Sequence, residues 1–182
     1  TIEPNINNYR SLQNWLCGIN AAAVLQRLIK FAKEKTMEAD SIKAESAGAF
    51  KRQEDHFNQW VRRDGSTQHP AAPGRYHLYI SLACPWAHRT LIVRHLKKLE
   101  GSVSMSAVDP IRSEDSGWAF RPGPGHGPDL INGFSYLSEA YRASDPAYSG
   151  RVTVPVLWDK EKRCIVSNND DHILRMFNSE FD

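Results

Sequence analysis

One stretch of the sequence decides the fold: Tyr76-His77-Leu78-Tyr79-Ile80-Ser81-Leu82-Ala83-Cys84-Pro85-Trp86-Ala87-His88-Arg89-Thr90. Its first five residues form an apolar and aromatic run that is typical of a β-strand. A turn over residues 81–83 follows, and Cys84-Pro85 then begins a helix whose apolar residues recur at helical spacing. Proline is tolerated at the first helical position because its missing N–H group would have no partner there. The stretch therefore predicts a strand, a turn and a helix in succession.

This order places Cys84 at the N-cap of the helix, with Pro85 and Trp86 supporting the helix N-terminus beside it. Unpaired N–H groups and the positive end of the helix dipole favour a thiolate there, so a cysteine in this place is often a nucleophile or redox centre. A buried, inert cysteine is the alternative. No second cysteine follows two or three residues later, so we expect a one-cysteine site that reacts with an external thiol through a mixed disulfide.

The composition is that of an ordinary globular protein and excludes several classes. Of the 182 residues, 41% are hydrophobic and 24% are charged, and the formal net charge is +2 at pH 7. A charge so balanced does not indicate nucleic acid binding, and no apolar run is long enough to span a bilayer. The three cysteines and seven histidines show no disulfide framework and no metal-ligand spacing, so we expect no metal.

The three cysteines, Cys17, Cys84 and Cys164, suit an intracellular, reducing compartment. The sequence starts at Thr1 rather than Met, which indicates that a segment was removed. A processed location in an organelle, plastid or mitochondrial, therefore stays open.

Two regions of different character make up the chain. Residues 1–48 are read as an N-terminal arm with a basic amphipathic helix over residues 20–37, and residues 49–182 as one folded domain. The amphipathic helix either packs on its own domain or lies on a membrane or a partner. A further short helix is expected over residues 50–63, carrying Phe57 and Trp60.

The pattern after the Cys84 helix gives the rest of the fold. The expected elements are a strand over 102–108, a long loop over 109–150 with a short helix at 136–141, strands over 152–158 and 164–166, and a last helix. The first two strands pair in parallel because a helix joins them, and the last two form an antiparallel hairpin. Asn168 or Asn169 caps the last helix. The order β-α-β-loop-β-β-α predicts a thioredoxin-like α/β fold with an N-terminal helical extension.

Pro155 stands inside an apparently central strand, where a proline interrupts regular pairing. We predict that the Val154–Pro155 peptide bond is cis and lies beside Cys84, since tight turns at such prolines are often cis. The backbone N–H and C=O of Val154 would then grip the backbone of a bound peptide such as glutathione by strand-like pairing. An ordinary trans proline on an edge strand is the alternative.

Four motifs carry a family resemblance: Gly74-Arg75-Tyr76-His77-Leu78-Tyr79, Cys84-Pro85-Trp86-Ala87-His88-Arg89, Gly117-Trp118-Ala119-Phe120 and Gly150-Arg151-Val152-Thr153-Val154-Pro155-Val156-Leu157-Trp158-Asp159-Lys160. With them, the sequence from about Ala49 to Asp182 resembles the glutathionyl-hydroquinone reductases. These are the Xi class of glutathione transferases, close to the Omega class. The resemblance implies a thioredoxin-fold glutathione domain followed by an all-helical domain, usually as a dimer. It implies glutathione as co-substrate and a glutathionylated quinol as substrate.

The resemblance also implies a role for each matching residue. Cys84 attacks the sulfur of the bound glutathionyl group and releases the hydroquinone, and a second glutathione resolves the mixed disulfide. Trp118 covers glutathione, and Val154 pairs with the cysteinyl backbone of glutathione. Pro155 matches the cis-proline of the family.

The first departure from the family pattern concerns the γ-glutamyl end of glutathione, which Glu and Ser hold at the start of the last helix. Here Asn169 stands at the Glu position and Asp170 at the Ser position. A serine hydroxyl donates to the ligand carboxylate, whereas an ionised aspartate only accepts. Two carboxylates about 4 Å apart repel by up to roughly 4 kcal/mol at an effective dielectric of 20. We expect weak glutathione binding unless the amino group of the ligand shifts toward Asp170.

The second departure is that the sequence ends at Phe181-Asp182, where the all-helical domain should begin. That domain supplies the hydroquinone pocket and most dimer contacts in the family. We therefore expect the all-helical domain to be absent, and another protein chain to cover the face that it leaves and the N-terminal helix.

Two hypotheses follow. The first is an enzyme, a glutathione-dependent thiol transferase similar to the glutathionyl-hydroquinone reductases that acts through Cys84. The second is a catalytically retired glutathione transferase-like domain that serves as a structural or docking subunit of a larger assembly. The intact cysteine and proline motifs favour the first hypothesis, and the altered γ-glutamyl site favours the second.

Overall fold

Four strands form the central mixed sheet of the computed structural model, which describes residues 54–113 and 117–181. The strand order is β4 (Val103–Ala107), β3 (Tyr76–Ile80), β5 (Val156–Asp159) and β6 (Cys164–Ser167). Strand β3 pairs with β4 in parallel and with β5 antiparallel, and β6 runs antiparallel to β5. The predicted parallel pair and the predicted hairpin are both confirmed.

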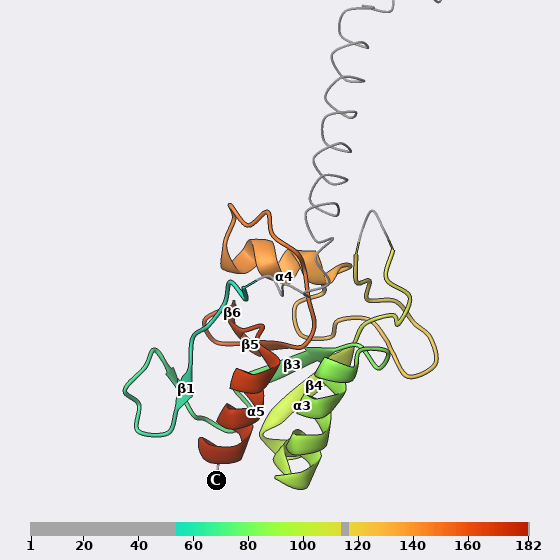
Figure 1. The fold of residues 1–182 in the computed structure, drawn as a ribbon. Helices are drawn as coiled ribbons and strands as arrows, with labels where there is room; N and C mark the ends of the chain where they lie inside the picture. Colours follow the sequence, from blue (N-terminus) through green and yellow to red (C-terminus); the bar gives the residue numbers. More distant parts are fainter. Residues whose placement is uncertain (1–53, 114–116, 182) are drawn as a thin grey trace, which may run out of the picture. The chain divides into compact units, whose positions relative to one another are not determined.

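Helices cover both faces of this sheet (Figure 1). Helix α3 (Pro85–Leu96) and helix α5 (Asp170–Ser179) lie side by side on one face, and α4 (Leu137–Ser144) lies on the other. A 3-10 turn, η1 (Leu99–Gly101), connects α3 to β4. This arrangement is the predicted thioredoxin-like fold, and it brings the N-terminal ends of α3 and α5 to one region of the molecule.

Strand β3 is the centre of the core because it is covered from both sides. All five of its residues are buried, including His77 and the large rings of Tyr76 and Tyr79. A strand that is buried on both faces reads as a continuous apolar run rather than an alternating one. Trp158 on β5 is also fully buried and meets the ring of Phe134 edge to face at 5.9 Å.

The helix predicted over residues 50–63 is wrong in its described part. Residues 54–60 contain no helix and continue into a short strand, β1 (Val61–Arg62), which pairs in parallel with β2 (His69–Pro70). The reason is a set of backbone hydrogen bonds to the open edge of β6: Gln59 donates to Val166 at 2.9 Å, and Asn168 donates to Phe57 at 3.1 Å. Pairing with β6 satisfies groups that a helix would have paired locally.

The third predicted strand begins four residues later than expected, at Val156 rather than Val152. Pro155 has no N–H group to offer to a neighbouring strand. The backbone of Thr153 is held by a side chain instead, because its N–H donates to the Tyr141 hydroxyl at 3.1 Å and its carbonyl accepts from that hydroxyl at 2.9 Å. Helix α4 thus fixes the segment that leads to Pro155.

The long loop before α4 is tied to the sheet by one buried carboxylate. Asp129 accepts hydrogen bonds from the Tyr79 hydroxyl and from the backbone N–H groups of Ile131, Asn132 and Phe134. The predicted short helix inside this region is present, but it runs from Leu137 to Ser144 rather than from 136 to 141. The loop is therefore a built part of the domain.

Residues Glu54–Asp182 form one compact unit. The amphipathic helix expected over residues 20–37, the boundary expected at residue 49 and Cys17 lie outside the described residues. Within the described residues, every helix is too short or too polar to cross a membrane.

Candidate functional site

Cys84 is the N-cap residue of α3, as predicted. Its backbone is extended, with φ of −98° and ψ of 115°, and Pro85 occupies the first helical position. The backbone is fixed on both sides, because Cys84 N–H donates to Ser81 at 3.1 Å and His88 N–H donates to Cys84 at 2.9 Å. The thiol makes no capping bond to the helix, and the residue is partly exposed. The cysteine backbone is therefore held at a defined place, and the residue is partly exposed.

The Val154–Pro155 peptide bond is cis, as predicted, and it lies beside this thiol. The Cys84 Sγ atom is 3.7 Å from the carbonyl oxygen of Val154, which accepts its S–H. Val154 and Pro155 are both buried. The structure thus brings together three of the residues that the sequence marked.

Trp86 and Trp118 differ in how they are held. Trp86, the second residue of α3, is 49% exposed and projects from the domain. Trp118 is partly buried against the core, and its carbonyl oxygen accepts from the N–H of Leu137 at the start of α4 at 2.9 Å. This bond ties the Trp118 backbone to a helix end, while its place over glutathione stays a prediction.

Asn169, one of the two residues predicted to cap the last helix, is the N-cap of α5. Its Oδ1 atom accepts from the N–H of His172 at 3.0 Å, and its Nδ2 group donates to Asp55 at 2.8 Å. Both ends of the amide are therefore engaged within the protein.

Asp170 is the first residue of α5 and is only 1% exposed. Its Oδ2 atom accepts from Nη1 of Arg89 at 2.9 Å, and Nη2 of Arg89 donates to Asp171 at 2.9 Å. Opposite charges about 4 Å apart attract by roughly 4 kcal/mol at an effective dielectric of 20, less the solvent screening at the half-exposed Arg89. This attraction is similar in size to the repulsion expected between Asp170 and a glutathione carboxylate. Asp170 and Asp171 therefore share the single positive charge of Arg89.

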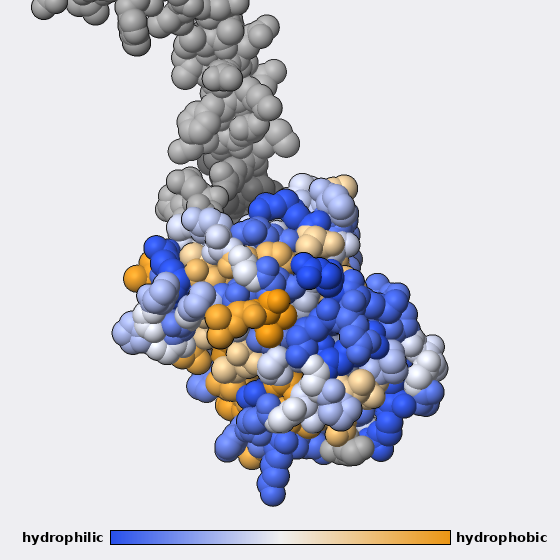
Figure 2. Space-filling model, turned by 180° about the vertical axis from the view of Figure 1, so that it is seen from behind, coloured by the Kyte–Doolittle hydropathy of each residue, from blue (hydrophilic) through white to orange (hydrophobic). Residues whose placement is uncertain are grey.

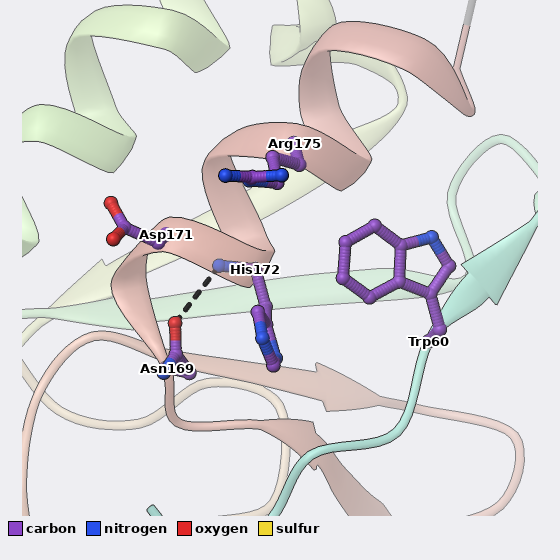
Figure 3. Close-up of a pocket in the computed structure, with 5 residues that line it drawn as sticks. All are labelled: Trp60, Asn169, Asp171, His172 and Arg175. Carbon is purple, nitrogen blue, oxygen red and sulfur yellow. Dashed lines mark hydrogen bonds between the residues drawn. The ribbon is translucent and has the colours of Figure 1, made fainter.

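A pocket of about 330 Å³ lies beside the first turns of α5 (Figure 3). It is lined by Trp60, Asn169, Asp171, His172 and Arg175. The ring of His172 meets that of Trp60 at 5.3 Å, and the Asp171 carboxylate points away from Trp60 in Figure 3. Cys84 is not one of the lining residues, so this pocket flanks the predicted γ-glutamyl positions rather than the thiol.

Sequence reasoning missed Arg89 and Asp55 as partners of the predicted site. Arg89 stands in the same motif as Cys84, but no local pattern links it to Asp170, 81 residues later. Asp55 lies in the segment that was expected to be helical and that instead runs along β6 to reach Asn169. The only sequence signal for Arg89 was the pair of adjacent carboxylates, Asp170 and Asp171, because two such groups at a helix start favour a charge-assisted bond from a nearby cation.

Cys164 is the other cysteine of the described region. Burial raises the pKa of the Cys164 thiol, and the charge of Asp159 raises it further. Cys164 is thus a poorer nucleophile at neutral pH than a cysteine with an ordinary pKa. Among residues 54–113 and 117–181, no group of three or more His, Cys, Asp or Glu side chains is arranged to hold a metal ion.

A mixed four-stranded sheet, a cysteine at the N-cap of its first helix and a cis-proline beside the thiol define a thioredoxin-like domain. Residues 83–180 match the family described as glutathione S-transferase, N-terminal domain. The chain belongs to this family.

The relatives place the chain near one class of that family. It is 48% identical over 144 residues to glutathionyl-hydroquinone reductase YqjG of Escherichia coli (strain K12), covering 75% of this chain and 44% of that protein. The Xi class glutathione transferase of Natrialba magadii matches with a TM-score of 0.69 and 50% identity over 74% of this chain and 42% of the other. The glutathione-bound structure of YqjG matches with a TM-score of 0.65 and 50% identity, covering 69% and 43%. The chain thus spans less than half the length of these relatives.

Proposed function

We propose that the chain is a glutathione-dependent thiol transferase domain of the glutathionyl-hydroquinone reductase type, with Cys84 as its nucleophile. The observation that carries the proposal is the position of the Cys84 sulfur, at the start of α3 and 3.7 Å from the Val154 carbonyl oxygen. The identity to YqjG and the glutathione bound to that relative give the ligand class.

The reaction needs one protein thiol and two glutathione units. The Cys84 thiolate attacks the sulfur of a glutathionyl-hydroquinone, the sulfur–carbon bond breaks, and the ring carbon takes up a proton to leave as the hydroquinone. The resulting mixed disulfide on Cys84 is attacked by the thiolate of a second glutathione, which releases glutathione disulfide and restores the Cys84 thiol. Two electrons pass from the thiols to the ring carbon. A second protein cysteine is not needed.

The backbone of the site supports this chemistry. The segment that ends at Val154 carries a carbonyl oxygen at the thiol, where an extended cysteinyl residue of the ligand would pair with it. Trp118 would cover the ligand, and the start of α5 at Asn169 and Asp170 would face its γ-glutamyl end, where N–H groups of a helix N-terminus attract a carboxylate. Glutathione is the only co-substrate proposed.

The test is to expose the purified chain to a glutathionyl-hydroquinone and to measure protein mass and glutathione binding. The proposal expects one glutathione added per chain, removal by free glutathione, and calorimetric binding of glutathione at millimolar concentration or below. Cys84→Ser should abolish the adduct, while Cys164→Ser, the matched cysteine control, should keep it. An adduct on Cys164, or no adduct and no glutathione binding, would contradict the proposal.

A second candidate is a retired glutathione transferase-like domain that docks in a larger assembly. It is favoured by one observation: the two residues at the predicted γ-glutamyl site are engaged inside the protein, Asn169 with Asp55 and Asp170 with Arg89. A folded chain that gives no adduct and binds no glutathione would select this candidate.

The apolar surface supports a protein partner under either candidate. Figure 2 shows apolar residues gathered on the face turned away from the viewer in Figure 1. The large apolar side chains that are exposed in the described region are Leu82, Trp86, Ile92, Leu96, Ile111, Leu130 and Tyr136. An exposed apolar patch often marks an interaction site. An intracellular, reducing or organellar location also belongs to the proposal.

A further inference from the structure

We infer that Arg89 determines how this site holds the γ-glutamyl end of glutathione, by donating to its α-carboxylate. The inference rests on the proposed function, because it names one contact of the ligand that the Cys84 site would bind. It assigns to an arginine on α3 the donor role that the side chains of Asn169 and Asp170 on α5 cannot fill.

The first step is the chemistry of those two side chains. Asp170 is 1% exposed, and an ionised carboxylate has no hydrogen to donate. Asn169 uses its oxygen to cap α5 and its Nδ2 group to bind Asp55. A ligand carboxylate that arrives at the start of α5 therefore finds neither predicted residue ready to donate from its side chain.

The second step is that Arg89 has donors to offer at the same place. Its guanidinium lies across the first turn of α5, with Nη1 at 2.9 Å from Asp170 and Nη2 at 2.9 Å from Asp171. Those two bonds use two of the five N–H donors of a guanidinium. The Arg89 side chain is 52% exposed, so a ligand can reach it. The two aspartates hold the Arg89 guanidinium in place, and its remaining N–H groups can donate to a ligand.

The third step is reach along the helix. Arg89 follows Cys84 by five residues, which is about 7.5 Å along the helix axis. The cysteinyl residue and the γ-linked glutamyl arm of extended glutathione cover about two residue lengths, or roughly 7 Å. The spacing of the two residues along the helix is therefore similar to the length of ligand between its cysteinyl residue and its α-carboxylate.

The fourth step is charge. The α-carbon of the γ-glutamyl group carries an ammonium as well as a carboxylate at neutral pH. Asp171 is 61% exposed and accepts from Arg89 on the rim of this site, where an ammonium group would meet it. The Arg89–Asp171 pair thus offers one charge of each sign to a zwitterion, while the buried Asp170 shares the same guanidinium. The three side chains together carry one net negative charge, which the ligand ammonium at Asp171 would offset.

The experiment compares glutathione with 4-aminobutanoyl-Cys-Gly, which is glutathione without the α-carboxylate. Calorimetry on the full chain gives the affinity ratio of the two ligands for wild type, Arg89→Gln and Arg142→Gln. Arg142 is an exposed arginine on α4 that serves as the matched charge control. Wild type and Arg142→Gln should bind glutathione at least about tenfold more tightly than the analogue, as a charge-assisted bond predicts. Arg89→Gln should bind the two ligands within about twofold of each other.

Because Arg89→Gln leaves Asp170 buried with its guanidinium partner removed, Arg89→Gln/Asp170→Ala is measured beside it and should show the same loss of discrimination. If Arg89 only clamps α3 to α5, both variants will weaken the two ligands equally and keep the wild-type ratio, which overturns the inference and leaves the proposed function standing. If wild type binds neither ligand, the inference and the proposed function both fail.

Discussion

The guanidinium of Arg75, just before β3, donates from Nη2 to the carboxylate of Asp159 at the end of β5, at 2.6 Å. The same carboxylate accepts from Nδ1 of His69 at 2.8 Å and from two backbone N–H groups of the turn that follows. Asp159 is fully buried. Burial raises its pKa, but the hydrogen bonds from Arg75 and His69 outweigh burial and hold the pKa below the usual value. This charge network joins β2, β3 and the β5–β6 turn.

Replacing Asp159 by Asn should destabilise the domain by about 3–5 kcal/mol, because it leaves the buried guanidinium of Arg75 without its main partner. Urea denaturation of wild type and variant measures the change. Glu161→Gln is the matched control, since Glu161 is an exposed partner of the same Arg75 and its loss should cost less than about 1 kcal/mol. Equal effects of the two changes would show that burial of Asp159 does not matter.

Stability should fall in acid because of His77. Burial chiefly, with the charges of Lys160 and Arg94, lowers the pKa of His77 to about 3. Between about pH 6.5 and pH 3 the unfolded chain therefore binds a proton at this residue that the folded chain does not bind. The free energy of unfolding should decline as pH falls through this window, by up to about 1.4 kcal/mol per pH unit from this one group.

The measurement is denaturation of wild type and His77→Asn at several pH values from 7 to 4. The difference between the two should shrink as pH falls, because only wild type carries the buried imidazole. Ile92→Ala, which removes an exposed apolar side chain and no titratable group, should run parallel to wild type. A His77→Asn curve that also runs parallel to wild type would exclude His77 as the source of the acid sensitivity.

Loss of the α5 cap should cost stability without loss of the fold. Asn169→Ala removes the acceptor for the His172 N–H and should lower the free energy of unfolding by about 1 kcal/mol. Asn169→Ser, which retains a capping oxygen, should keep most of the stability that Asn169→Ala loses. Asn178→Ala, near the exposed end of the same helix, is the control, and a loss there as large as at Asn169 would contradict a capping role.

Trp118 should matter for binding more than for folding. If its indole covers glutathione, Trp118→Ala should weaken glutathione affinity on the order of tenfold, the value of one aromatic contact. Leu130→Ala, in the same long loop and highly exposed, should leave the affinity unchanged. Calorimetry measures the glutathione affinity of both variants. An unchanged affinity for Trp118→Ala would show that the Trp118 indole does not contact glutathione.

Sequence reasoning worked best where a structure depends on neighbours along the chain. Strand β3 was predicted to the residue, and Cys84 as N-cap and Pro85 as first helical residue followed from the rules for helix starts. It failed at residues 54–60, where an apolar pattern that fits a helix is instead paired with β6. It also placed the start of β5 too early, because the Tyr141 hydroxyl rather than a strand holds Thr153.

The sequence by itself determined the kind of site: a single cysteine at a helix start, with a proline after Val154 to meet it, since turn and cap chemistry is written in adjacent residues. Only the tertiary structure decided the charge of that site. Arg89 and Asp170 are 81 positions apart, and each belongs to a separate helix. Packing of α3 against α5 brings the guanidinium to the carboxylate. Contacts between surfaces of separate elements depend on how those elements pack, which no local pattern records.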